Sequence, residues 1–190
     1  GRISNIGAEN VWANAEWEND TYTMWVFGKI REAKFFGDYL ELTRKITTFM
    51  DRPTIFIEDS VENIGFKIAP LMILYHFNIG YPLLDRSAQL LEGNAEVLPW
   101  DEESEKHIQH CREFSDPISD FKNQVFYHDI DPDEEGNSNI ALVNPKFNQE
   151  NGMGIWLKFN KDNLPYLIQW KYLAKGDYVC GIEPANSFIR

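Results

Sequence analysis

The chain has 190 residues, of which 43% are hydrophobic and 14% aromatic, and its formal net charge is −12. This length and apolar content suffice for one globular domain with a buried core, and they argue against a linker or a disordered segment. Because the acidic charge repels phosphate backbones and anionic lipid surfaces, the composition argues against nucleic-acid binding and membrane docking. Only two cysteines are present, Cys111 and Cys180, so we expect no disulfide framework and predict a cytoplasmic protein.

Short strands are predicted from the first third of the chain onward. β-branched and aromatic residues recur with a period near two in residues 21–30, and similar alternation follows in 43–50 and 54–59. A turn rich in polar residues and proline separates the last two segments, as in an antiparallel strand pair. The apolar run 69–75 then leads into a polar cluster that begins with His76, and we expect a strand to end there.

The second half of the chain continues the strand pattern after one interruption. Residues 99–120 are rich in charged side chains and predict an exposed loop with one helical turn. Many short strands separated by Gly, Pro and Asn favour an antiparallel sandwich or barrel, and the absence of a Gly-rich phosphate loop argues against a nucleotide-binding fold. The expected strands in this half are 124–127, 140–143, 154–159, 166–172 and 178–182, with an acidic loop at 129–136.

Two residues stand out as candidates for acid–base chemistry. His76 lies beside Asn78 at the end of an apolar run, where it can face a pocket, although a core imidazole bonded to a carbonyl is the alternative. Glu183 follows the last apolar strand and precedes Pro184, which lacks an N–H, so we expect strand pairing to stop there. A carboxylate at that point is either catalytic or a partner for an arginine.

The motifs around these residues resemble a known superfamily. The segment YHFNIGYPLL at 75–84 resembles the His-containing Phe-Asn motif of the aldose 1-epimerase (galactose mutarotase) superfamily, and GIEP at 181–184 resembles its glutamate motif. Together with GRISN at 1–5 and LPYLIQWK at 164–171, these segments resemble the DUF4432 group of that superfamily more closely. The resemblance implies an all-β, galactose-mutarotase-like β-sandwich (a supersandwich). In this interpretation residues 1–190 form a single domain, the C-terminal part of the sandwich, and further N-terminal strands precede Gly1.

The resemblance also implies a function, that of a cofactor-independent aldose 1-epimerase acting on a hexose or an acid-substituted sugar. Anomer interconversion needs a base that takes the proton of the C1 hydroxyl and an acid that protonates the ring oxygen. By the resemblance, Glu183 is the base and His76, as an imidazolium, is the acid. This chemistry requires no cofactor and no metal. His107, His110 and Cys111 could be imagined as metal ligands, but no second ligand pair lies at a suitable spacing, so no metal site is predicted.

Several further residues are expected to bind the substrate, a small-molecule carbohydrate. Trp170 could stack on a sugar face, with a core tryptophan as the alternative. Arg2 and Asn5 match the Gly-Arg-x-x-Asn motif that the resemblance places near the sugar, although Arg2 could instead pair with a carboxylate. The remaining candidates are Asn78, which could instead fix the turn after His76, and the pair His128 and Asp129, which resembles a His-Asp pair of the DUF4432 group and could touch the substrate.

Alternatives to an epimerase remain open. Better-known mutarotases use a second histidine in an earlier segment, and this sequence has no counterpart, which leaves galactose in question as the substrate. A non-catalytic carbohydrate-binding or sensor protein of the same fold is the main alternative, and a lyase acting next to a uronic acid is a third. If the chain starts at Gly1, a homodimer contact or a partner chain would have to cover an open sheet edge; otherwise an N-terminal segment is missing.

Overall fold

The computed structural model describes residues 6–188 and shows a chain built almost entirely of antiparallel sheets. Strands hold 54% of the residues and helices 6%, which confirms the predicted all-β class. The chain forms two compact units, Gly1–Leu71 and Met72–Arg190. The single domain expected from the sequence stays a prediction.

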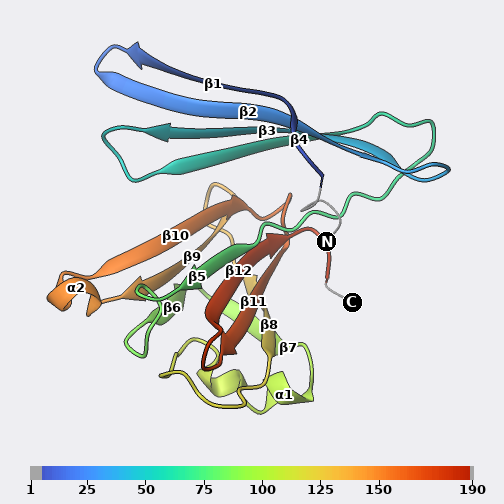
Figure 1. The fold of residues 1–190 in the computed structure, drawn as a ribbon. Helices are drawn as coiled ribbons and strands as arrows, with labels where there is room; N and C mark the ends of the chain where they lie inside the picture. Colours follow the sequence, from blue (N-terminus) through green and yellow to red (C-terminus); the bar gives the residue numbers. More distant parts are fainter. Residues whose placement is uncertain (1–5, 189–190) are drawn as a thin grey trace. The chain divides into compact units, whose positions relative to one another are not determined.

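The first unit is a four-stranded antiparallel sheet with the strand order β1-β2-β3-β4 (Figure 1). Its strands are β1 (Glu9–Glu18), β2 (Thr21–Ala33), β3 (Tyr39–Phe49) and β4 (Ile55–Asn63). The structure confirms the last three, each longer than its sequence pattern indicated. Strand β1 was not predicted, because its Glu, Asn and Ala residues have low strand propensity and only pairing with β2 selects the extended conformation.

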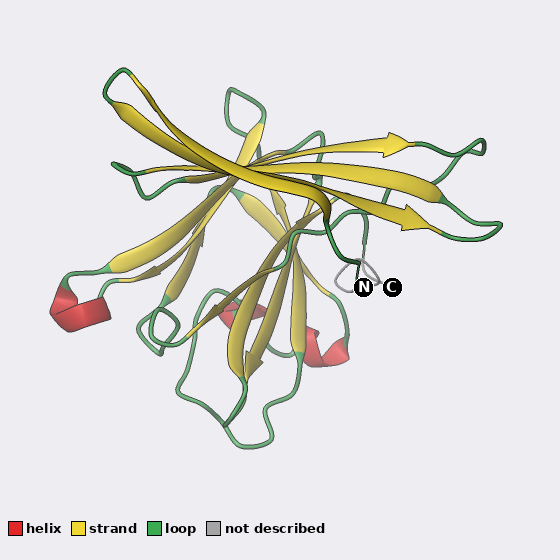
Figure 2. Ribbon diagram, turned by 45° about the horizontal axis from the view of Figure 1, so that its top comes forward, coloured by secondary structure: helices red, strands yellow, loops and turns green. Residues whose placement is uncertain are grey.

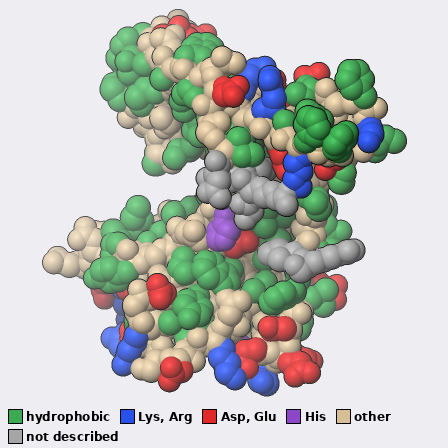
Figure 3. Space-filling model, turned by 45° about the vertical axis from the view of Figure 1, so that its right-hand side comes forward, with side chains coloured by type: hydrophobic (Ala, Val, Ile, Leu, Met, Phe, Trp, Pro, Cys, Tyr) green, Lys and Arg blue, Asp and Glu red, His purple; other side chains and the backbone are tan. Residues whose placement is uncertain are grey.

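Apolar side chains occupy both faces of this sheet. The cross-strand pair of Trp12 and Phe27 lies on one face, and Val26 lies between Ala13 and Ile46 on the other. Hydrophobic side chains accordingly gather on the surface of this unit in the space-filling view (Figure 3), with Trp12 still 52% exposed. The face of Trp12 and Phe27 also carries polar side chains, among them Lys29 and Arg31, which both pair with Glu41, whereas the face of Val26 is mainly apolar.

The second unit contains two antiparallel sheets (Figure 2). The larger has the order β5-β12-β11-β8-β7, so that three strands from the C-terminal half of the chain lie at its centre. Its strands are β5 (Phe77–Gly80), β7 (Ala95–Pro99), β8 (Gln124–Ile130), β11 (Tyr166–Leu173) and β12 (Tyr178–Ala185). The smaller sheet has the order β10-β9-β6 and comprises β6 (Gln89–Glu92), β9 (Asn137–Asn144) and β10 (Met153–Asn160).

One buried cluster joins these two sheets. Leu167 and Ile182 of the larger sheet belong to the same cluster as Leu90, Ile140 and Leu142 of the smaller one, and each is at most 2% exposed. A fully buried Leu or Ile side chain stabilises a fold by roughly 1.5–3 kcal/mol. The cluster therefore fixes which face of β11 and β12 points into the core, while Ile168 and Ala185 on their other face belong to a second, smaller buried cluster.

Short helices occur between the strands. The predicted helical turn is present as α1 (Glu102–Glu105), where the Asp101 carboxylate caps the helix by accepting the Ser104 N–H at 2.8 Å. A 3-10 turn follows at Ile108–His110, and α2 (Phe147–Glu150) precedes β10. None of the helices in the described part of the chain has the length and hydropathy that crossing a membrane requires.

Two local expectations were wrong. Residues 69–75 form no strand, although an isolated bridge joins Leu74 to Ala185, and the strand lies instead after His76, in β5. Pro184 does not end the pairing of β12, since it lies opposite Leu167. The Pro184 carbonyl accepts the Tyr75 N–H at 2.9 Å. In a strand the backbone nitrogen and carbonyl of one residue point to the same side, so the Pro184 nitrogen faces the irregular run before β5 and not β11.

Candidate functional site

His76 and Glu183 form a direct pair at the edge of the larger sheet. Phe77 pairs with Ile182 across β5 and β12, so the preceding residue, His76, comes opposite Glu183. The His76 Nε2 atom lies 3.0 Å from the Glu183 Oε1 atom. The histidine side chain is 41% exposed and the glutamate side chain 3%. The buried carboxyl group therefore contacts an imidazole that is open to solvent.

Strand alternation determines which neighbours share this face. Trp170 lies opposite Gly181 on β11, and Asn78 lies opposite the same glycine on β5. Gly181 and Glu183 are two positions apart on β12 and therefore point to one face, whereas Ile182 points into the core. We call this surface, formed by His76, Asn78, Trp170, Gly181 and Glu183, the site face.

Burial changes the protonation of both members of the pair. It raises the pKa of Glu183 to about 7, and it lowers the pKa of His76 below its ordinary value. Both changes have the same cause, because removing a charged group from water disfavours its charged form. Near neutral pH the two groups are thus suited to share one proton across the 3.0 Å contact, with one as donor and the other as acceptor.

Trp170 forms an aromatic wall beside the pair. Its ring lies 5.8 Å from the His76 ring, centroid to centroid, at an interplanar angle of 83°. On its other side it is nearly parallel to Tyr172, at 15° and 6.3 Å. The indole N–H donates a hydrogen bond to the side-chain oxygen of Asn123, so the ring is held in one orientation.

Gly181 allows the close approach of these side chains. A Cβ atom at this position would lie 2.5 Å from the Glu183 Oε1 atom, 3.1 Å from His76 Cε1 and 3.3 Å from Trp170 Cβ. The first distance is far below van der Waals contact, so any side chain here would displace the carboxyl group. No local sequence pattern indicates this role of Gly181, because it depends on the neighbouring strands.

We expect Gly181→Ala to move the Glu183 carboxyl group away from His76 and to lower the free energy of unfolding by about 1–3 kcal/mol, as overpacking does. Thermal unfolding and a ¹³C titration of the Glu183 carboxyl carbon measure the two effects. Gly93→Ala is the matched control, because nothing lies within 4 Å of its added Cβ. An unchanged Glu183 titration in Gly181→Ala would show that the glycine is not required.

The structure does not bring His128 to the site face. It lies opposite Leu167 and points into the core, where it is 1% exposed. Its Nδ1 atom is 2.9 Å from Glu92 Oε2 and its Nε2 atom 3.1 Å from Gln169 Oε1, while Arg112 contacts Glu92 at 2.6 Å. In place of the expected substrate contact, we assign His128 to this buried polar network.

This assignment predicts a stability effect without an effect on the site. We expect His128→Leu to lower the free energy of unfolding by about 3 kcal/mol, because Glu92 stays buried with one partner fewer. Urea unfolding measures the loss, and the Glu183 titration should not change. His107→Leu is the control, since that histidine pairs with Glu103 at 3.5 Å on the surface. If His128→Leu were as stable as the wild type but altered the Glu183 titration, His128 would be part of the site and not of the buried network alone.

The other predicted substrate residues have different positions. Asp129 is exposed and pairs with Lys161 at 2.6 Å, so the described contacts do not bring it to His76 or Glu183. Asn78 is exposed on the site face. Arg2 and Asn5 lie outside the described residues. Within residues 6–188, no three His, Cys, Asp or Glu side chains are grouped so that they could hold a metal ion.

Comparisons with known proteins agree with this fold. The model of the family described as "Domain of unknown function (DUF4432)" matches residues 1–190. No curated protein matches the sequence. A solved structure, described as a "putative aldose 1-epimerase" from Klebsiella pneumoniae subsp. pneumoniae MGH 78578, superimposes with a TM-score of 0.91 and 24% sequence identity. The match covers 99% of this chain and 48% of that one, so this chain spans about half the length of the solved protein.

The structural likeness shows the fold, an aldose-1-epimerase-like β-sandwich, and confirms the fold class expected from the His and Glu motifs. The family match covers the full sequence and confirms the resemblance stated from those motifs. This chain therefore belongs to the DUF4432 family.

Proposed function

We propose that the site face binds a small sugar and interconverts its two anomers, as an aldose 1-epimerase does, without a cofactor. The observation that carries the proposal is the contact between His76 Nε2 and Glu183 Oε1 at 3.0 Å, with the carboxyl group buried and the imidazole open to solvent. The likeness to a solved structure described as a putative aldose 1-epimerase supports it at the level of the fold.

The geometry of the pair suits the hemiacetal group of a cyclic sugar. The C1 hydroxyl oxygen and the ring oxygen are bonded to the same carbon, so two catalytic atoms that lie side by side can address both. Glu183, as carboxylate, takes the proton of the C1 hydroxyl, while His76, as imidazolium, gives a proton to the ring oxygen. The C1–ring-oxygen bond breaks and an open-chain aldehyde forms. After rotation about the C1–C2 bond, the reverse transfers close the ring as the other anomer.

The protonation of the pair fits these roles. A carboxyl group with a pKa of about 7 is a stronger base than an ordinary glutamate, and an imidazolium with a lowered pKa is a stronger acid. The reactive form, carboxylate with imidazolium, differs from the uncharged form only in the position of one proton. Both transfers conserve protons and electrons, so the reaction needs no co-reactant.

The neighbouring side chains suit a sugar ligand. The half-buried Trp170 ring offers a flat apolar surface next to His76, and the exposed Asn78 amide can hydrogen-bond hydroxyl groups on the same face. We therefore place the sugar over the site face, against Trp170 and the His76–Glu183 pair. The proposed substrates include sugars with an acidic substituent, and the experiment below identifies the sugar.

Magnetisation-exchange NMR between α and β anomers tests the proposal across a panel of aldoses that includes uronic and sulfonated sugars. We expect exchange above the spontaneous rate for at least one member. No exchange for any sugar, combined with protein signals that shift on addition of one sugar, would contradict catalysis and favour a carbohydrate-binding protein instead.

A further inference from the structure

The orientation of Trp170 depends on a residue outside the site face. Asn123 lies on the exposed loop before β8, and its side-chain oxygen accepts the indole N–H of Trp170. Since an indole nitrogen is only a donor, the bond requires an acceptor at this position. The ring is then held by Asn123 at its nitrogen, by Tyr172 on one face and by His76 at 5.8 Å.

We propose that Asn123 is a positioning residue for sugar binding: by holding the indole N–H of Trp170, it fixes the plane of the aromatic wall beside His76. The inference rests on the proposed function in so far as the wall receives the sugar. Asn123 itself touches neither member of the acid–base pair in the described contacts. Its effect is therefore expected on substrate affinity and not on the chemical step.

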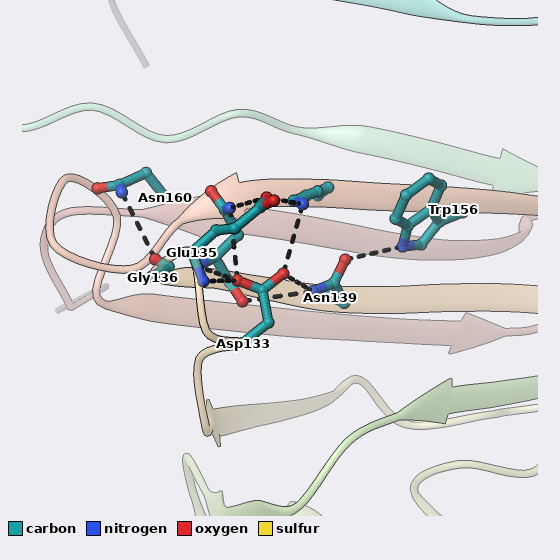
Figure 4. Close-up of polar contacts among 8 residues, drawn as sticks. Asp133, Glu135, Gly136, Asn139, Trp156 and Asn160 are labelled. Atoms are coloured by element: carbon teal, nitrogen blue, oxygen red, sulfur yellow. Dashed lines mark hydrogen bonds and ion pairs between the residues drawn. The ribbon is translucent and has the colours of Figure 1, made fainter.

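A second pair of the same type provides a matched control. Trp156 of β10 is 66% exposed, and its indole N–H donates to the side-chain oxygen of Asn139 at 3.1 Å (Figure 4). The Asn139 amide donates in turn to Asp133 at 3.1 Å. This pair belongs to the smaller sheet, so replacing Asn139 removes the same kind of bond away from the site face.

Three variants separate the roles of the Asn123 side chain. Asn123→Leu has a similar volume and no acceptor, whereas Asn123→Asp keeps an acceptor oxygen and loses the amide donors. A positioning role requires that Asn123→Asp behave like the wild type. If the amide instead donated directly to the sugar, Asn123→Asp would be as impaired as Asn123→Leu. Asn139→Leu controls for the loss of a surface Trp–Asn bond.

The first measurement is the ¹H–¹⁵N signal of the Trp170 indole, identified by its absence in Trp170→Phe. We expect Asn123→Leu to shift this signal and to speed exchange of its proton with water, while Asn123→Asp retains a slowly exchanging proton and Asn139→Leu leaves the signal in place. An unchanged indole signal in Asn123→Leu would overturn the inference. This readout needs no activity.

The second measurement is the rate of anomer exchange as a function of sugar concentration. We expect Asn123→Leu to raise KM roughly three- to ten-fold with kcat within about two-fold, which corresponds to the loss of one oriented aromatic contact. Asn123→Asp and Asn139→Leu should match the wild type. A fall in kcat with constant KM, or an impaired Asn123→Asp, would overturn the positioning role.

Failure of the proposed function is distinguishable from failure of this inference. If the wild type does not exchange anomers with any sugar, the proposed catalysis fails. Sugar affinity is then measured from shifts of the protein signals. The Kd of Asn123→Leu is expected to be roughly three- to ten-fold higher than that of Asn139→Leu. If no sugar binds the wild type at all, the positioning role in sugar binding is overturned with it, even where the indole signal confirms the hydrogen bond.

Discussion

Replacing Glu183 with glutamine is expected to lower the rate of anomer exchange by roughly 10²–10⁴-fold, the usual contribution of a general acid or base. The glutamine has nearly the same shape and can still bond His76, but its amide cannot take the proton of the C1 hydroxyl. The loss should therefore appear in kcat more than in KM. Magnetisation-exchange NMR at neutral pH, with the best sugar of the panel, measures it.

The chain offers a control with the same substitution at a similar contact. His110 Nδ1 lies 3.1 Å from Glu113 Oε2, but both side chains are 70% exposed. Glu113→Gln should therefore exchange anomers at the wild-type rate. The comparison separates a buried acid–base pair from a surface ion pair of similar geometry. Wild-type exchange in Glu183→Gln would remove Glu183 from the mechanism and, with it, the proposed function in its present form.

Glu183→Gln is also expected to make the protein more stable in mildly alkaline solution, by on the order of 3 kcal/mol at about pH 8. The pKa of Glu183 is about 7 in the folded protein, against an ordinary value of 4.5. Between these two values the folded state binds more protons than the unfolded state, so the free energy of unfolding of the wild type falls as the pH rises. Below about pH 4 both states are protonated and the two proteins should be similar.

His76 acts in the opposite direction but with a smaller effect. Its pKa is lowered on folding, so its contribution to the free energy of unfolding rises with pH below its ordinary value of 6.5. Because the imidazole is 41% exposed, solvent screens this contribution. Between pH 4.5 and about 7 the free energy of unfolding of the wild type should therefore fall with rising pH, as Glu183 dictates. Urea unfolding across this range compares the wild type, Glu183→Gln and Glu113→Gln. Parallel pH curves for all three would mean that burial does not perturb Glu183.

Together these two results would connect stability with function at one side chain. Carboxyl groups whose pKa is strongly raised by burial cluster at functional sites, where a matched pKa has a use. Rapid exchange in the wild type, with a more stable and inactive Glu183→Gln, is the combination expected of a catalytic base. A stability gain without any activity in the wild type would favour a binding site.

The fold class, most strands and the two central residues of the proposed site could be predicted from the sequence alone. Alternating β-branched and aromatic residues specify β2, β3 and β11 because a half-buried strand has a side-chain period of two. His76 and Glu183 were identified by their motifs and by their polar character at the ends of apolar runs. Short strands such as β5 were missed, because four residues contain too little periodicity to distinguish a strand from a loop.

Which of these residues meet depends on the tertiary fold, because strand pairing joins segments that are far apart in the sequence. The register of β5 against β12 brings His76 opposite Glu183, and the close approach at Gly181 exists only in that register. His128 and Asp129 are adjacent in the sequence but point to opposite sides of β8, and nothing local indicates which side is the core. Packing of the two sheets of the second unit buried His128 and left the other face of β11 and β12 for the site.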